Sequence, residues 1–152
     1  MSKKIIEKYF SDADLKEIAN SINAIESVTS GELRLCVHIK KSFFDRKKSP
    51  REIALNTFLK MGMHKTKHRT GVLIYILLDE RKFEIVADEG INKMIAEHEW
   101  NEIQQSLINE FRESHYLKGV QNSIKLIGEK LKTHFPREEN DINELSNDVL
   151  IR

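Results

Sequence analysis

G-V-L-I-Y-I-L-L-D-E-R-K-F-E-I-V-A-D-E-G-I, residues 71–91, is the stretch that decides the fold. Val72–Leu78 has no polar alternation, which predicts a central strand covered on both faces. Asp79-Glu80 then turns the chain into a second strand over Lys82–Ala87; the turn lacks the Gly or Asn that a two-residue hairpin turn prefers, so a longer turn stays open. The stretch ends in an acidic loop, Asp88-Glu89-Gly90, beyond the carboxyl end of a strand, where α/β sheets commonly bind ligands.

The segments on either side of this stretch supply the other elements. Alternating apolar residues predict a strand over Glu32–Ile39. Helical apolar spacing and end signals predict four helices, over residues 11–29, 49–61, 97–113 and 117–135. The order of elements predicts an α/β fold, a three-layer α/β/α sandwich in which helices flank both faces of a small mixed sheet of three to four strands. The first strand–helix–strand unit is expected to be parallel and the hairpin antiparallel.

Length and composition favour one domain. The 152 residues fit a single domain over residues 1–135, followed by a polar, acidic tail over residues 136–152 in which Val149–Ile151 can dock. The single cysteine, Cys36, forbids an intrachain disulfide and favours a reducing compartment. We find no signal-peptide pattern, and no run reaches the roughly 18 apolar residues of a membrane span. We therefore expect a cytoplasmic protein without a membrane span.

Charge is unevenly distributed along the chain, although the net charge is only +1. Residues 40–69 are strongly basic, with two acidic residues opposing them. Within this segment, Lys40–Lys48 places Phe43 and Phe44 between basic residues, a composition that suits single-stranded nucleic acid or an anionic membrane surface. We instead interpret it as a crossover loop whose phenylalanines pack against the core, and we expect no nucleic-acid partner.

Six short motifs follow one another along the chain: T-S-G-E-L-R at 29–34, G-M-H-K-T at 62–66, G-V-L-I-Y at 71–75, E-R-K-F at 80–83, D-E-G-I at 88–91 and F-R-E-S-H-Y-L-K-G-V at 111–120. Together, over about Phe10–Phe135, the chain resembles the TPM-domain family, which includes thylakoid-lumen and photosystem-repair proteins and many bacterial proteins. Its tail resembles a bacterial subgroup that carries the domain alone. The resemblance implies an α/β/α fold, divalent-cation binding in some members and acid-phosphatase activity in plant relatives, but no settled substrate.

Asp88 and Glu89 are the leading candidates for a metal site, with Glu32 and His64 as weaker candidates. These residues lie near strand ends or crossover loops that a mixed sheet can collect at one edge. Carboxylates and the carbonyls of a glycine-containing loop are the oxygen ligands that Ca²⁺ and Mg²⁺ prefer, whereas a ligating His favours Mn²⁺ or Zn²⁺. The alternative interpretation is a solvated turn in which Asp88 caps the segment that follows it.

The function predicted for this site is a cation-dependent change in loop order. Neighbouring loops with unpaired carboxylates repel, and a bound cation cross-links them, which predicts a metal-responsive regulatory or interaction module with a protein partner of unknown identity. The alternative is a metal-assisted phosphatase acting on phosphate monoesters, with Arg69 or Lys67 neutralising the phosphate. We can assign no catalytic base or nucleophile for it. Asp79 and Glu80 lie roughly 20 Å from Asp88, six residues along a strand, and are expected to form a solvated turn.

Two further pairs of residues resemble a zinc-binding spacing and a nucleophile pair, but their contexts do not fit either chemistry. His64 and His68 are spaced for zinc on a helix, but they fall in a loop and lack the Glu of a metalloprotease. Cys36 and His38 share one strand face at a backbone separation of about 6–7 Å, too far for a nucleophile pair, so Cys36 is expected in the core. No glycine-rich phosphate loop is present in the sequence, and no organic cofactor is expected.

Overall fold

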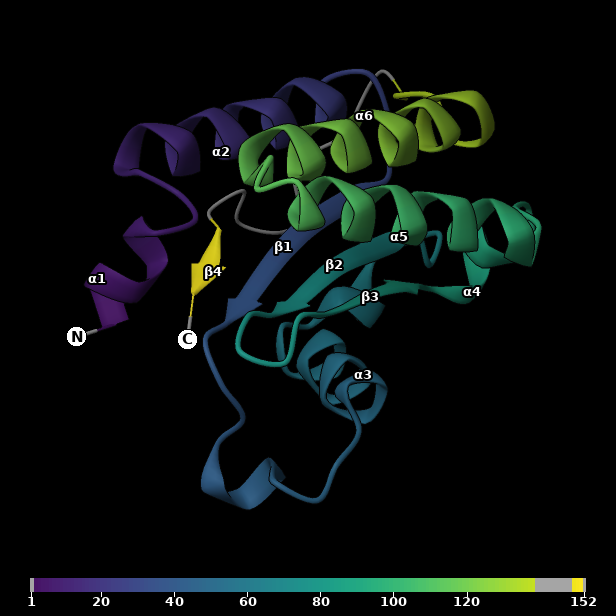
Figure 1. Cartoon of the computed structure of the whole chain (residues 1–152). Coiled ribbons are helices and arrows are strands. Elements are labelled where there is room, and N and C mark those ends of the chain that lie inside the picture. Colours follow the sequence, from purple (N-terminus) through teal and green to yellow (C-terminus); the bar gives the residue numbers. More distant parts are fainter. Residues whose placement is uncertain (1, 139–148, 152) are drawn as a thin grey trace.

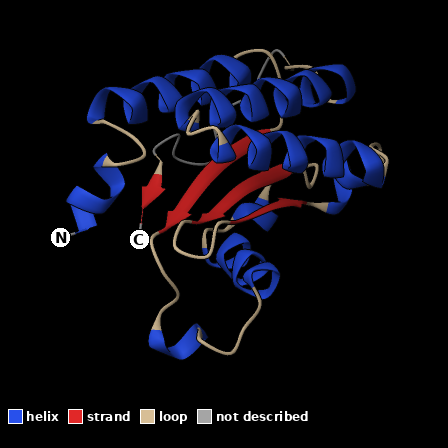
Figure 2. Cartoon of the chain, in the orientation of Figure 1, coloured by secondary structure: helices blue, strands red, loops and turns tan. Residues whose placement is uncertain are grey.

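A computed structural model describes residues 2–138 and 149–151 and places four strands in one sheet, in the order β3-β2-β1-β4. The strands are β1 (Glu32–His38), β2 (Gly71–Leu77), β3 (Lys82–Ala87) and β4 (Leu150–Ile151). β1 and β2 pair in parallel, β2 and β3 are antiparallel, and β4 pairs in parallel with the other side of β1. The predicted small mixed sheet is therefore confirmed (Figure 2).

The described residues form the helices α1 (Ser2–Glu7), α2 (Asp12–Glu26), α3 (Pro50–Lys60), α4 (Glu89–Asn92), α5 (Glu97–Arg112) and α6 (Tyr116–His134), with short 3₁₀ turns η1 (Phe43–Asp45) and η2 (Met63–Lys65). Helices α2, α5 and α6 cover one face of the sheet and α3 covers the other (Figure 1). The three-layer prediction is thus confirmed. The sequence patterns do not predict α1 or α4, because one or two turns are too short to display helical periodicity.

The two faces of the sheet bury two separate sets of apolar side chains. Towards α2, α5 and α6 the strands present Leu33, Leu35, Val37, Val72, Ile74 and Ile76. Towards α3 they present Cys36, Leu73, Tyr75 and Leu77, which pack on Ile53, Ala54 and Phe58. Because β2 contributes to both sets, its sequence shows no polar alternation, as predicted for a central strand.

The helix ends follow local signals that the sequence contains. Ser11 and Asp14 form a capping box at the start of α2. The Ser49 hydroxyl accepts a hydrogen bond from the Glu52 N–H at the start of α3. Gly62 adopts the left-handed conformation, with φ of 72°, just after α3 ends. These boundaries are confirmed because each depends on residues only a few positions apart.

The loop between β1 and α3 differs from the prediction. Phe43 is 70% exposed and Phe44 is 89% exposed, so the prediction that both pack against the core is wrong. The loop runs away from the sheet, on the side of α3, before the chain returns to the start of that helix (Figure 1). The core positions on this side of the sheet are filled by α3 itself, through residues such as Ile53 and Phe58.

The chain end docks as predicted for Val149–Ile151. Leu150 and Ile151 pair with Cys36 and Val37 of β1. Residues 139–148 lie outside the described residues, so the proposed tail boundary at residue 136 stays a prediction. Among the helices of the described residues, none combines the length and the apolar character that a membrane crossing requires. The cytoplasmic location stays a prediction from the sequence.

Candidate functional site

One end of the sheet, where β1 and β2 begin and β3 ends, gathers predicted ligands from separate parts of the chain. We call it the paired end. Glu32 lies opposite Gly71 in the register of β1 and β2, and the Asp88 N–H donates to the Gly71 carbonyl at 2.9 Å. The structure therefore places Glu32, Asp88 and Glu89 at one edge of the sheet, which is the juxtaposition expected from the order of strands.

Asp88 is a buried carboxylate, 6% exposed, that holds two elements together. Its Oδ1 accepts a hydrogen bond from the Glu89 N–H at 2.8 Å and so caps α4, as the alternative interpretation predicted, but Asp88 is not solvated as that interpretation also expected. Its Oδ2 accepts a hydrogen bond from the Arg69 Nε at 2.8 Å. Arg69 Nη1 also lies 3.5 Å from the Glu89 carboxylate. The two carboxylates are therefore bridged by a guanidinium, and the hydrogen bond to Asp88 raises the pKa of Arg69.

The backbone of the 66–70 loop packs tightly against α4. A Cβ on Gly90 would overlap the His68 carbonyl oxygen and lie 2.5 Å from that of Arg69, so only glycine fits there without movement of backbone. The Thr66 hydroxyl accepts a hydrogen bond from the Thr70 N–H at 3.0 Å. Arg69 itself has a left-handed φ of 56°, which is unusual for a residue with a side chain. The Asp88 contact thus joins a constrained loop to the end of β3.

Glu32 and His64, the weaker predicted ligands, have different surroundings. The Glu32 carboxylate accepts a hydrogen bond from Arg34 Nη2 at 3.1 Å, and Arg34 Nη1 bonds the carboxylate of Glu26. All three side chains are buried, so this end of β1 contains a charged cluster inside the protein. His64 lies in η2, and its buried Nδ1 has no hydrogen-bond partner among the described residues. No group of three or more His, Cys, Asp and Glu side chains in the described part of the chain is arranged to hold a metal ion.

Arg34 and Arg69, at the paired end, contact carboxylates that the sequence did not identify as their partners. The sequence indicates Arg69 only as a phosphate-binding candidate beside Lys67, whereas the structure engages it with Asp88 and Glu89; Lys67 is exposed. Arg34 was not singled out, although its position two residues after Glu32 puts both on one strand face. The spacing of Glu32 and Arg34 was the available signal in the sequence. Charged residues on one face of a buried strand need partners inside the protein, because an unpaired buried charge is costly.

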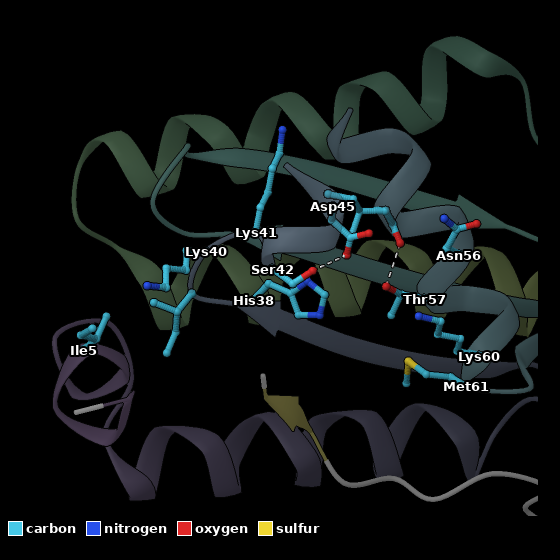
Figure 3. A pocket seen from close by; sticks show the side chains of 12 residues that line it. Ile5, His38, Lys40, Lys41, Ser42, Asp45, Asn56, Thr57, Lys60 and Met61 are labelled. Atoms are coloured by element: carbon cyan, nitrogen blue, oxygen red, sulfur yellow. Dashed lines mark hydrogen bonds between the residues drawn. The ribbon is translucent and has the colours of Figure 1, made fainter. Parts of the chain in front are cut away.

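The opposite end of the sheet, where β1 and β2 finish, contains a pocket of about 510 Å³ (Figure 3). We call this the open end. Its polar lining comes from β1, the loop after it and α3, and consists of His38, Lys40, Lys41, Ser42, Asp45, Asn56, Thr57 and Lys60. Three lysines face a single carboxylate, that of Asp45, which pairs with Lys48 at 3.1 Å. The hydrogen bond from Lys48 lowers the pKa of Asp45. The pocket is therefore basic.

A buried tyrosine supports the histidine of this pocket. The Tyr75 hydroxyl lies 2.7 Å from His38 Nδ1, within hydrogen-bond distance. Burial raises the pKa of Tyr75, so its hydroxyl stays protonated at neutral pH. Sequence reasoning considered Cys36 as the neighbour of His38 and missed Tyr75, which comes from the adjacent strand. Cys36 is fully buried, which confirms the prediction that it is a core residue.

The fold and the motifs define the class of protein. A family model described as the TPM domain matches residues 6–130. The chain therefore belongs to the TPM-domain family, as its six motifs predicted. No curated protein matches it.

Three solved structures resemble the chain. The NMR structure of the BA42 protein from the psychrophilic bacterium Bizionia argentinensis is 30% identical, with a TM-score of 0.85 and complete coverage of both chains, 100% of each. The N-terminal domain of a P. gingivalis protein is 16% identical, covers 86% of this chain and 83% of its own, and has a TM-score of 0.69. The N-terminal domain of cg2496 from Corynebacterium glutamicum is 10% identical, with 89% and 81% coverage and a TM-score of 0.62. The last two matches support the fold alone.

Proposed function

We propose that this TPM domain binds a divalent cation at the paired end, through the carboxylates of Asp88 and Glu89, and that binding changes the order of the 66–70 loop. One observation carries the proposal: the Arg69 guanidinium bridges both carboxylates. A guanidinium and a hard divalent cation are alternative partners for the same carboxylate oxygens. Cation binding is therefore coupled to the release of Arg69.

The exposure of the three side chains supports this exchange. The side chain of Asp88 is 5% exposed, whereas those of Arg69 and Glu89 are 45% and 75% exposed. Arg69 can leave by rotating into solvent, without unfolding of the loop backbone. The buried Asp88 carboxylate then needs a new positive partner, because an unpaired buried charge is costly. The sequence suggests neighbouring loops whose unpaired carboxylates repel. In the structure Arg69 contacts both carboxylates, so we propose that the divalent cation takes the place of the guanidinium.

Asp88 and Glu89 fit Ca²⁺ or Mg²⁺, which take oxygen ligands. His64 is the next candidate, because its buried Nδ1 lacks a partner among the described residues, and its participation favours Mn²⁺ or Zn²⁺. Glu32 is the weakest, because ligation would compete with its hydrogen bond to Arg34. A bound cation would supply positive charge at the loop junction, and this chain's residues would respond through the freed Arg69.

The proposal is tested by titrating Ca²⁺, Mg²⁺ and Mn²⁺ and following backbone amide shifts in the 66–70 and 88–92 segments. We expect saturable shifts in both segments. Asp88→Asn weakens binding at least about tenfold, because a charged ligand is lost. Arg69→Gln tightens binding, because the competing guanidinium is gone.

Matched controls exist at the other end of the hairpin. Arg81 is also exposed and also has a left-handed φ, of 51°, so Arg81→Gln should leave cation affinity unchanged. Asp79→Asn removes an exposed carboxylate of the same dipeptide sequence and should have no effect. Equal affinity in the wild-type chain and in Asp88→Asn would reject the site, as would weaker binding in Arg69→Gln.

A further inference from the structure

The crossover between β1 and β2 carries most of the large apolar side chains that are exposed. In the described residues seven such side chains are exposed, and four belong to this crossover: Phe43 at 70%, Phe44 at 89%, Leu55 at 41% and Leu59 at 53%. We call the loop of residues 39–49 and the outward side of α3 the crossover face. Single exposed apolar residues are common, but a group on one segment indicates an interaction surface.

The crossover face is directed away from the sheet. The loop containing η1 extends beyond α3 on the same side of the sheet (Figure 1). α3 buries Ile53, Ala54, Thr57 and Phe58 against the sheet. Leu55 and Leu59 are one turn apart on the opposite side of the helix, because successive residues advance by about 100°. The loop and the helix therefore lie on the same side of the sheet, and both carry exposed apolar side chains (Figure 1).

This face is also rich in positive charge. Residues 39–60, which form the loop and α3, hold seven of the 25 Lys and Arg residues but only two of the 24 Asp and Glu residues, and the rest of the chain is net acidic. One of the two acids, Asp45, pairs with Lys48 and also accepts a hydrogen bond from Ser42. Lys40, Lys41 and Lys60 surround the pocket between the loop and α3 (Figure 3). The apolar groups of the loop thus belong to a segment rich in cations, and Arg46 lies over the Phe43 ring.

We propose that the crossover face docks on an anionic phospholipid membrane. Phe43 and Phe44 enter the boundary between headgroups and acyl chains, while the lysines and arginines meet lipid phosphates. Arg46, which lies 4.2 Å over the Phe43 ring, is long enough to turn outward to the headgroups as the ring enters the bilayer. The proposal concerns a surface and a partner distinct from the cation site at the paired end.

The same observations favour a bilayer over single-stranded nucleic acid. Base stacking requires open ring faces, and Arg46 covers one face of Phe43. The Phe43 and Phe44 rings meet edge to face, at 85° and 5.8 Å between centroids, so they do not form a parallel stacking platform. Leu55 and Leu59 offer apolar contact but no π-face. A second copy of this face is disfavoured as a partner, because two strongly basic surfaces repel.

The test is flotation of the full chain with vesicles of phosphatidylcholine alone or of phosphatidylcholine with phosphatidylglycerol, in a chelating buffer. We expect binding only to the anionic vesicles, and weaker binding at high salt because exposed charges are screened. Phe43→Ser with Phe44→Ser should lower vesicle affinity at least about tenfold. Val28→Ser with Met94→Ser is the matched control, since both side chains are exposed outside the crossover face, and it should bind as the wild-type chain does.

A second pair of variants tests the charges. Lys40→Gln with Lys47→Gln should weaken binding and reduce its salt dependence, whereas Lys125→Gln with Lys132→Gln, two exposed lysines on α6, should not. In Phe44→Trp the tryptophan emission should shift to shorter wavelength on anionic vesicles. The proposal is overturned by absence of vesicle binding at low salt, or by full binding of the double serine variant. Binding of an oligothymidine, or a dimer that depends on Phe43 and Phe44, in place of vesicle binding would overturn it equally.

Discussion

The two ends of the sheet differ in where their charged side chains lie: charges are buried in ion pairs at the paired end and line a pocket at the open end. At the paired end, carboxylates are buried and meet arginines: Glu26 and Glu32 contact Arg34, and Asp88 contacts Arg69. At the open end, lysines surround a solvent-accessible pocket and two phenylalanines extend beyond it. The first arrangement holds loops and strands together, while the second leaves positive charge and apolar surface facing outward for a partner.

A repeated dipeptide makes the contrast sharper. Asp79-Glu80 and Asp88-Glu89 lie at the two ends of the same strand, β3. Asp79 and Glu80 are exposed, and the Glu80 carboxylate lies 3.5 Å from Lys41 Nζ in a partly exposed ion pair. Asp88 is buried, caps a helix and bonds Arg69. The same two residue types therefore take different roles because the neighbouring loops differ, and substitutions at the two ends should have unequal effects.

The largest effect is expected from Arg34→Ala. The substitution leaves Glu26 and Glu32, which are 4% and 3% exposed, without their common counter-ion, and breaking a buried ion pair typically costs about 3–5 kcal/mol. The free energy of unfolding, measured by urea denaturation, should fall by that amount, whereas Arg112→Ala on the exposed side of α5 should change it little. A loss below about 1 kcal/mol, the scale of an exposed pair, would contradict the buried cluster.

Gly90→Ala should have the next largest effect, at about 3 kcal/mol, because the added Cβ meets backbone carbonyls of the 66–70 loop and not a movable side chain. Urea denaturation measures the loss, and amide shifts of residues 66–70 show whether the loop has moved. An unchanged stability with unchanged shifts would mean that α4 and this loop are not in contact.

The two acidic dipeptides provide the third comparison. Asp88→Ala should cost about 1–2 kcal/mol through loss of the N-cap of α4, with a further salt-sensitive loss from the Arg69 pair. Asp79→Ala should stay within about 0.5 kcal/mol of the wild-type chain, because the Asp79 side chain is exposed and its backbone hydrogen bond to the Ile39 carbonyl is kept. Equal losses in thermal or urea unfolding would remove the distinction between the two ends of β3.

The smallest effect on stability is expected at the tip of the crossover loop. Phe43→Ser with Phe44→Ser should change the free energy of unfolding by no more than about 0.5 kcal/mol, because neither ring is in the core. If this variant keeps its stability, a loss of vesicle binding reports the loss of the apolar surface and not unfolding of the chain. A loss of several kcal/mol would show that the rings are buried in solution.

The sequence predicts the fold more completely than it predicts the candidate sites. The edge that collects Asp88, Glu89 and Glu32 follows from strand order, so the sequence indicates it. The partners do not: Arg69 lies 19 residues from Asp88, and its left-handed backbone has no local signal in T-K-H-R-T. The exposure of Phe43 and Phe44 was likewise missed, because composition alone cannot tell a loop that folds back from one that projects.

By itself, the sequence determined the four long helices and the three longer strands, the caps of α2 and α3, the central position of β2, the mixed sheet and membership of the TPM-domain family. These depend on periodicity and on signals a few residues apart, such as Ser49 before α3 and Gly62 after it. Only the tertiary structure decided which charges are paired and which stay open, since the energy of a carboxylate or an aromatic ring depends on what lies across from it. That is why Asp88 is buried beside Arg69, while Phe44 stands in solvent among lysines and arginines.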